Sequence, residues 1–246
     1  MKKMAILLSG GVNYINDYPR YGNDLGFAYT VLTENCNYDS NNMDVLYSFG
    51  KDIIYQGTTI KTHIASHKNL EAALAKAANQ LEDEDEFILV VSNHGSDINE
   101  GLINLWNQEE IFFDSLAELL KHIKAKKVIV LGECYAGNFI RDDIPNCCIL
   151  AGNEKDKKTF VNPHNHNYDE FLFNFFSFLY GKFPDSGTLI DSSVVDIEKA
   201  FIFARENDAF NPNNPNYCSR YNSPNHDIVE IPQMFNNIID LHSMLK

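Results

Sequence analysis

Two apolar runs of the chain each lead into a side chain that can do covalent chemistry. The first ends in Ser92-Asn93-His94-Gly95, and the second ends in Gly132-Glu133-Cys134. A thiol with an ordinary pKa of ~8.5 is mostly protonated at neutral pH, and an imidazole beside it can accept the proton. A lone cysteine at a strand end is more often a core residue, and a lone histidine is more often simply hydrogen-bonded. The repeated pattern instead favours a His94–Cys134 pair for nucleophilic catalysis.

The elements that would position this pair alternate along the chain. Short apolar or β-branched runs predict buried strands, and the segments between them have helical periodicity. Strands are expected at 4–9, 44–49, 87–92, 127–131 and 147–151, and helices at 23–34, 68–82, 113–123, 169–179 and 195–207. Such alternation gives a mostly parallel sheet covered on both faces, with sites at the carboxyl ends of its strands. His94 and Cys134 are therefore expected at one edge of the sheet, with the N–H groups of Gly95 and Cys134 forming an oxyanion hole.

Composition excludes several other classes of function. Of 246 residues, 20 are basic and 34 acidic, and the net charge of −14 disfavours nucleic acid and anionic membrane surfaces as partners. The longest apolar run near the start, at 4–8, is too short for a leader or a membrane span. Five cysteines without a CxxC spacing argue against a disulfide framework and a zinc site, so a reducing, cytoplasmic setting is expected.

The same motifs resemble those of a known family. Asn93-His94-Gly95-Ser96 and Gly132-Glu133-Cys134-Tyr135-Ala136-Gly137 are similar, in order and spacing, to the His-Gly and Cys motifs of the legumain-like and caspase-like cysteine peptidases, clan CD. The resemblance covers about residues 3–205. It implies a three-layer α/β/α sandwich with a mostly parallel six-stranded sheet of the caspase-hemoglobinase type. We expect one domain over 1–246, with a C-terminal extension from about 208.

The resemblance also implies a substrate pocket. Arg20 matches the arginine that lines the family's specificity pocket, and Asp169 falls near a pocket acid of legumains. A guanidinium is a rigid fork of donors that suits a carboxylate or a carboxamide oxygen, which predicts cleavage after Asp or Asn. Asp169 and Asp24 are alternatives for simple neutralisation of Arg20.

The chain departs from the family at two positions. The family carries an acidic residue or Gln two residues before the nucleophile, where this chain has Gly132, and strand alternation should turn Glu133 away from Cys134. The legumain asparagine that orients the histidine corresponds to Tyr18. Asn13 or Asn16 could take that role, or the enzyme could work as a dyad.

The function expected from these observations is cysteine endopeptidase, a thiol protease that hydrolyses protein or peptide substrates without metal or organic cofactor. His94 would act as base and Cys134 as nucleophile. Regulation is expected from a protein partner or from the polar loop at 155–167, read as long and exposed near the active edge. A catalytically idle caspase-like scaffold is the alternative. A small-ligand sheet of the flavodoxin type is disfavoured because the chain has no phosphate loop.

Overall fold

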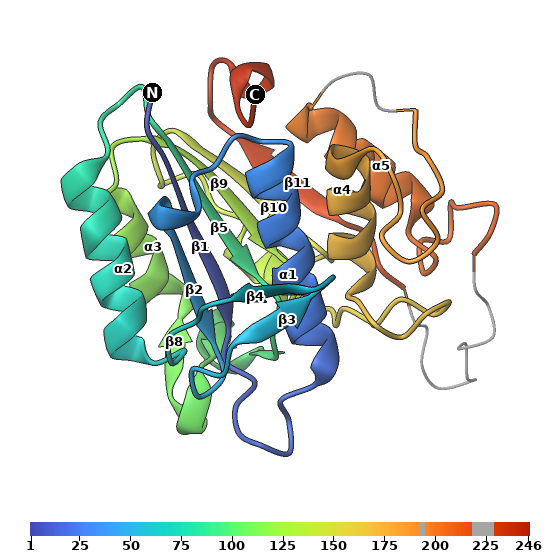
Figure 1. The fold of residues 1–246 in the computed structure, drawn as a ribbon, viewed down its shortest axis with the longest axis horizontal. Helices are drawn as coiled ribbons and strands as arrows, with labels where there is room; N and C mark the ends of the chain where they lie inside the picture. Colours follow the sequence, from blue (N-terminus) through green and yellow to red (C-terminus); the bar gives the residue numbers. More distant parts are fainter. Residues whose placement is uncertain (192–194, 218–228) are drawn as a thin grey trace.

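A six-stranded sheet forms the centre of the protein (Figure 1). The computed structural model describes residues 1–191, 195–217 and 229–246. The strand order is β11-β10-β9-β5-β1-β2. The strands are β1 (Lys3–Ser9), β2 (Met43–Tyr47), β5 (Glu86–Val91), β9 (Lys126–Leu131), β10 (Cys147–Ala151) and β11 (Gln233–Asn236). All neighbours pair in parallel except β11, which runs antiparallel to β10.

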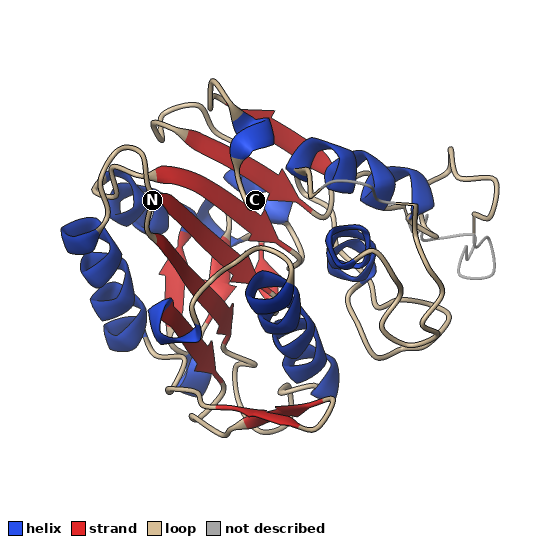
Figure 2. Ribbon diagram, turned by 45° about the horizontal axis from the view of Figure 1, so that its top comes forward, coloured by secondary structure: helices blue, strands red, loops and turns tan. Residues whose placement is uncertain are grey.

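Helices cover both faces of the sheet (Figure 2). One face carries α1 (Pro19–Glu34), α4 (Glu170–Tyr180) and α5 (Ile197–Asn207), and the other carries α2 (His67–Gln80) and α3 (Phe113–Lys121). Alternate strand residues serve the two cores: Leu7 packs towards α1, and Ile6 towards α2. This arrangement confirms the predicted three-layer α/β/α sandwich with a mostly parallel six-stranded sheet.

Two small antiparallel sheets flank the main one. β3 (Ile53–Tyr55) pairs with β4 (Thr58–Ile60), whereas β6 (Gly95–Ser96), β7 (Leu102–Asn104) and β8 (Glu110–Phe112) form a three-stranded sheet. The second sheet positions the site, because β6 begins at the residue after His94.

Three expectations about element boundaries need correction. α1 begins at Pro19, four residues before the expected start at 23, because a proline in the first turn needs no hydrogen-bonded N–H. After the turn-rich stretch at 211–216, the sequence predicts a last hairpin or helix at 226–246. The structure has β11 followed by a short 3-10 helix, Leu241–Ser243, with 226–228 outside the described residues. The loop at 155–167 is only partly exposed, since Thr159 and Asn162 are buried. In the described ranges no helix is long and apolar enough to cross a membrane.

Candidate active site

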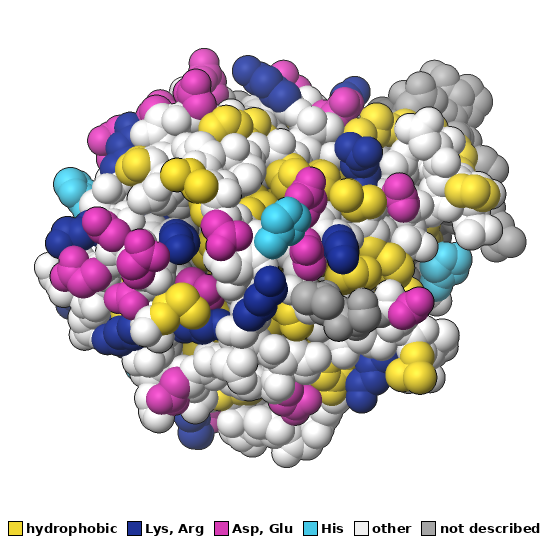
Figure 3. Space-filling view, turned by 90° about the horizontal axis from the view of Figure 1, so that it is seen from above, with side chains coloured by type: hydrophobic (Ala, Val, Ile, Leu, Met, Phe, Trp, Pro, Cys, Tyr) yellow, Lys and Arg dark blue, Asp and Glu magenta, His cyan; other side chains and the backbone are white. Residues whose placement is uncertain are grey.

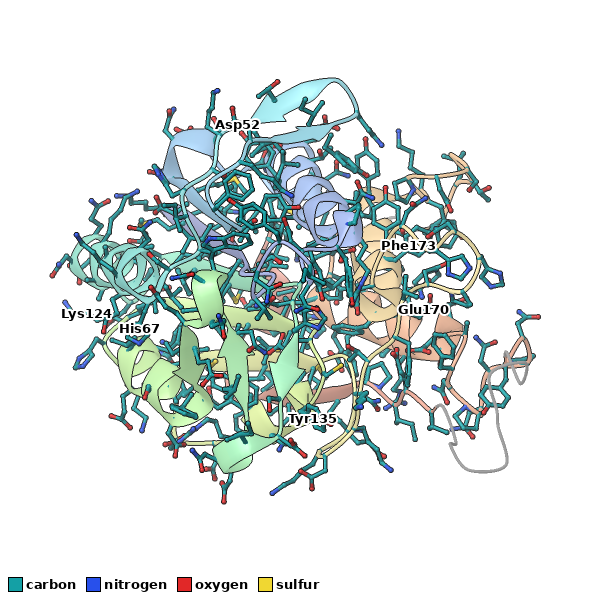
Figure 4. All side chains as sticks on the ribbon, turned by 90° about the horizontal axis from the view of Figure 1, so that it is seen from below. Asp52, His67, Lys124, Tyr135, Glu170 and Phe173 are labelled. Carbon is teal, nitrogen blue, oxygen red and sulfur yellow. The ribbon has the colours of Figure 1, made fainter. Side chains whose placement is uncertain are left out.

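Adjacent strands bring the two sequence motifs together. β5 and β9 are neighbours with Val91 opposite Leu131, and the Gly132 N–H donates to the Val91 carbonyl oxygen at 2.9 Å. A methyl group on Gly95 would collide with the carbonyl oxygen of Cys134, so only glycine allows the two loops to touch. Figure 4 views the protein from this edge of the sheet, with Tyr135, the residue after Cys134, labelled.

A backbone carbonyl orients His94. Its Nε2 lies 3.1 Å from the carbonyl oxygen of Asn16, which can only accept, so Nε2 carries the proton and Nδ1 keeps its lone pair. The rings of Tyr18 and Tyr21 pack edge-on against the imidazole, with centroids 5.2 and 5.4 Å away. Burial lowers the pKa of His94, with a smaller contribution from the charge of Arg20. The histidine is therefore neutral and able to accept a proton.

The Asn13 side chain has a different role from the one considered in the sequence. Its Oδ1 accepts the N–H groups of Ile15 and Asn16 at 3.0 and 3.2 Å. It shapes the loop that presents the Asn16 carbonyl, so neither Asn13 nor Asn16 orients the histidine through its side chain.

Cys134 rests against a threonine. Its thiol donates to the Thr159 carbonyl oxygen at 3.7 Å, and the Thr159 hydroxyl, which donates to the Gly132 carbonyl at 2.9 Å, lies 3.9 Å from the sulfur. Burial raises the pKa of Cys134, against a lowering effect of the hydrogen bonds to Thr159 and of Arg20. The free protein therefore holds a protonated thiol.

The predicted oxyanion hole consists of two backbone N–H groups, those of Gly95 and Cys134. Asn104 N–H donates to the His94 carbonyl at 3.2 Å, which makes His94 and Asn104 a hydrogen-bonded pair of the β6–β7 ladder. Because such pairs alternate, the Gly95 N–H points away from β7. Cys134 N–H has no acceptor within the described part of the chain. The following residue, Tyr135, has a φ of 65° and turns the chain sharply.

Arg20 and Asp169 face each other beside the cysteine. Arg20 Nη1 lies 3.8 Å from Asp169 Oδ2, beyond hydrogen-bond distance, and both atoms are buried without a hydrogen-bond partner in the described residues. The Asp169 carboxyl also caps α4 by accepting the Leu172 N–H at 3.0 Å. Asp24 instead accepts the Ser92 hydroxyl and the Asp169 N–H, so its oxygens have partners. Arg20 is thus only loosely neutralised, and the carboxyl groups of both Asp169 and Asp24 contribute.

Packing explains why position 132 is a glycine rather than the expected acidic residue or Gln. A Cβ at this position would lie 2.6 Å from Leu172 Cδ1 and 3.0 Å from Asp169 Oδ1. The N-terminus of α4 therefore occupies the space that a longer side chain would need, and it supplies a carboxyl there. The Glu133 side chain is fully buried, with its Cγ packed near Gly95, and burial raises the pKa of its carboxyl to about 8.

Hydrogen bonds to residues 230 and 231 hold the segment that carries Thr159 in place. Glu230 accepts the Phe160 N–H, and Asn153 Oδ1 accepts the Ile231 N–H at 2.9 Å. Glu230 and Glu170 belong to a cluster of buried carboxyl groups. Burial raises the pKa of Glu170 to about 7. Over 1–191, 195–217 and 229–246, no three His, Cys, Asp or Glu side chains are placed to hold a metal ion.

Three groups at the site had not been expected from the sequence. They are the Asn16 carbonyl, Thr159 and the hydroxyl of Tyr21, whose pKa is raised by burial and lowered to a smaller extent by Arg20. A backbone carbonyl has no sequence signature, and Thr159 lies 25 residues from the cysteine. Only Tyr21 had a signal, as the neighbour of Arg20.

Comparison with known proteins supports the fold. No family model and no curated protein matches the chain. Among solved structures, protein GSU0716 from Geobacter sulfurreducens has a TM-score of 0.61 and 14% sequence identity. The match covers 99% of this chain and 98% of that one. At this identity, the likeness establishes the shared architecture alone.

Proposed function

We propose that the protein is a cysteine endopeptidase in which Cys134 is the nucleophile and His94 the general base. The observation that carries the proposal is the contact between the His94-Gly95 and Cys134 loops, with His94 held through Nε2 by the Asn16 carbonyl. That hydrogen bond leaves Nδ1 as the basic nitrogen. A base held in this tautomer, on a loop that touches the loop of the cysteine, supports an assignment to thiol acyl transfer.

The reaction would proceed through a thioester. His94 Nδ1 takes the thiol proton as the Cys134 sulfur attacks the peptide carbonyl, and the N–H groups of Gly95 and Cys134 bind the resulting oxyanion. The protonated imidazole then gives its proton to the leaving amine, and the carbon–nitrogen bond breaks. Water, deprotonated by His94, attacks the thioester and releases the acid and the thiol.

The resting protonation states favour a restrained enzyme. In the free protein His94 is neutral and Cys134 is protonated. The reactive pair of thiolate and imidazolium would form only when a substrate displaces the thiol from Thr159. A regulatory partner could act on the loop that carries Thr159. Cys36, Cys147 and Cys148 are buried free thiols, which supports a role in a reducing compartment such as the cytoplasm.

Arg20 and Asp169 support a preference for Asn before the scissile bond. The guanidinium can donate to the side-chain amide oxygen, and the Asp169 carboxylate can accept from the amide nitrogen. An Asp side chain would satisfy Arg20 but meet Asp169 as a like charge. Asp substrates are therefore expected to be poorer while Asp169 is ionised.

The test is cleavage of fluorogenic peptides that differ in the residue before the scissile bond. We expect cleavage after Asn, abolished in Cys134→Ala and His94→Ala and retained in Cys148→Ala, which removes a core thiol. Cleavage that survives in Cys134→Ala would refute the nucleophile. Cleavage after Arg or Lys would refute the pocket and leave the mechanism standing.

One observation favours a second candidate, a catalytically idle scaffold. The Cys134 thiol hydrogen-bonds Thr159, and its pKa is raised. If no peptide is cleaved, alkylation of Cys134 across pH 6–10 decides between the candidates. An idle protein would show a cysteine whose reactivity is unaffected by His94→Ala.

A further inference from the structure

Three aromatic rings form an exposed cluster at the edge of the sheet that carries His94. Tyr14, Phe49 and Trp106 lie with ring centroids 4.9 to 5.5 Å apart, and we call this set the aromatic platform. Tyr14 is 75% exposed and Phe49 40%. Each ring packs directly on the other two, and Lys51 Nζ lies over the Phe49 ring, 5.9 Å from its centroid. The platform therefore offers an apolar surface with one cation beside Phe49.

The sheet order fixes where the platform lies. Phe49 follows β2, Tyr14 follows β1, His94 follows β5 and Cys134 follows β9, and these strands are consecutive in the order β2-β1-β5-β9. The platform therefore lies beyond His94, on the side away from Cys134. Asp169 lies on the cysteine side, since its Oδ1 is 3.0 Å from where a Cβ on Gly132 would be, and Arg20 Nη1 lies 3.8 Å from Asp169 Oδ2.

The platform is also tied to His94. Tyr14 is two residues before Asn16, whose carbonyl holds the imidazole. Trp106 N–H donates to the Ala65 carbonyl at 2.9 Å, and Gln108 N–H donates to the Val12 carbonyl at 3.1 Å, which fastens Trp106 to the loop of Tyr14. Such an exposed but anchored apolar group is typical of a binding surface.

We propose that the aromatic platform binds an apolar side chain in the substrate segment that leaves first, carboxyl-terminal to the scissile bond. This inference rests on the proposed function. His94 protonates the leaving amine, so the first residue of the leaving segment must lie beside the imidazole. An extended chain advances about 3.3 Å per residue, so the next residues continue over Tyr14 and its neighbours.

The fluorescence of Trp106 can test this proposal, because Trp106 is the single tryptophan of the chain. Two peptides of equal length, with Phe or Ser as the second residue after the cleavage-site Asn, would be titrated into Cys134→Ala while Trp106 emission is recorded. We expect a saturable emission change and about tenfold tighter binding of the Phe peptide. Adding Tyr14→Ala or Phe49→Ala should remove that advantage, and adding Ile54→Ala, an exposed residue of β3, should keep it.

Equal binding of the two peptides, or an advantage that survives both platform variants, would overturn the proposal. So would peptide-independent association of the protein in sedimentation that Tyr14→Ala abolishes, because the platform would then be covered by a second copy of the chain. A substrate ending in a fluorescent amide has no leaving-segment residues. If the unmodified protein cleaves that substrate but the two peptides bind alike, the platform proposal alone fails, whereas no cleavage of any substrate counts against the peptidase itself.

Discussion

The two ends of the central sheet differ in whether their buried charged side chains have hydrogen-bond partners. At the end where the strands begin, Lys3 Nζ donates to the carbonyl oxygens of Cys36 and Lys246 at 2.9 and 2.7 Å and pairs with Glu86 at 3.3 Å. Lys127 Nζ likewise donates to two carbonyl oxygens, at 2.7 and 2.9 Å. Figure 3 views the protein from this end, where acidic and basic side chains are interspersed on the surface.

At the opposite end, buried polar groups lack partners. In the described residues, unpaired buried atoms occur on Arg20, Tyr21, Glu133 and Asp169, all close to Cys134. The hydroxyl of Tyr38, at the beginning of the sheet, is also unpaired, and so are buried side-chain atoms of six other described residues: Ser9, Asp17, Glu170, Ser177, Asp208 and Glu230. Since an unmet buried polar atom costs free energy, the four such residues near Cys134 are consistent with the proposed site.

The largest effect is expected where pairing is complete. Lys3→Ala leaves the Glu86 carboxylate buried without its cation, so the free energy of unfolding should fall by about 3 kcal/mol. Urea unfolding measures it, with Lys2→Ala, whose ammonium is exposed, expected within about 0.5 kcal/mol of the unmodified protein. A Lys3→Ala protein as stable as Lys2→Ala would show that the pairing at this end contributes nothing.

The next effect is expected at Glu133. Its pKa in the folded protein, about 8, exceeds its ordinary value of 4.5, so its contribution to stability is full below pH 4.5 and is lost as pH rises towards 8. Glu133→Gln removes that loss and should be more stable than the unmodified protein by on the order of 2 kcal/mol at pH 8, with no such gain at pH 4. The measurement is thermal unfolding at both pH values, with the exposed Glu84→Gln as control. A gain that does not depend on pH would contradict the buried, unpaired carboxyl.

A change of about tenfold is expected in substrate choice. Asp169→Asn keeps the helix cap but removes the negative charge facing Arg20, so the ratio of kcat/KM for Asp over Asn substrates should rise about tenfold. Burial raises the pKa of Asp169, so lowering the pH with the unmodified protein should shift the ratio in the same direction. An unchanged ratio in the variant would remove Asp169 from the pocket.

The smallest effect concerns Tyr21. Its hydroxyl is unpaired, so Tyr21→Phe should change the free energy of unfolding by less than about 0.5 kcal/mol. Tyr55 is the matched control, since its hydroxyl pairs with that of Tyr168 at 3.0 Å and Tyr55→Phe should cost about 1 kcal/mol. Denaturant midpoints of the two variants test the contrast, and equal losses would mean that the Tyr21 hydroxyl has a partner in solution.

The parallel strands could be predicted because each contains a run of at least three apolar residues. β11 could not, since Gln233 and Asn236 flank only two apolar residues and its pairing with β10 is set by tertiary contact. The three-residue strands β7 and β8 are too short to show alternation.

The candidate site divides in the same way. His94 and Cys134 were predictable because each follows a long apolar run, and strand order alone brings them to one edge. Thr159 could not be found, because a loop closed by Glu230 and Asn153 brings it to the cysteine. The role of Gly132 became clear only with the packing of Leu172.

The most direct test of the account is labelling by a peptide electrophile with Asn next to the reactive carbon, followed by peptide mapping by mass spectrometry. The account predicts one adduct, on Cys134, formed far more slowly in His94→Ala and Arg20→Ala and unchanged in Cys148→Ala. Labelling of Cys134 at the same rate in His94→Ala, or no preference for the Asn peptide over a Lys peptide, would contradict the claim that this edge of the sheet is a peptidase site.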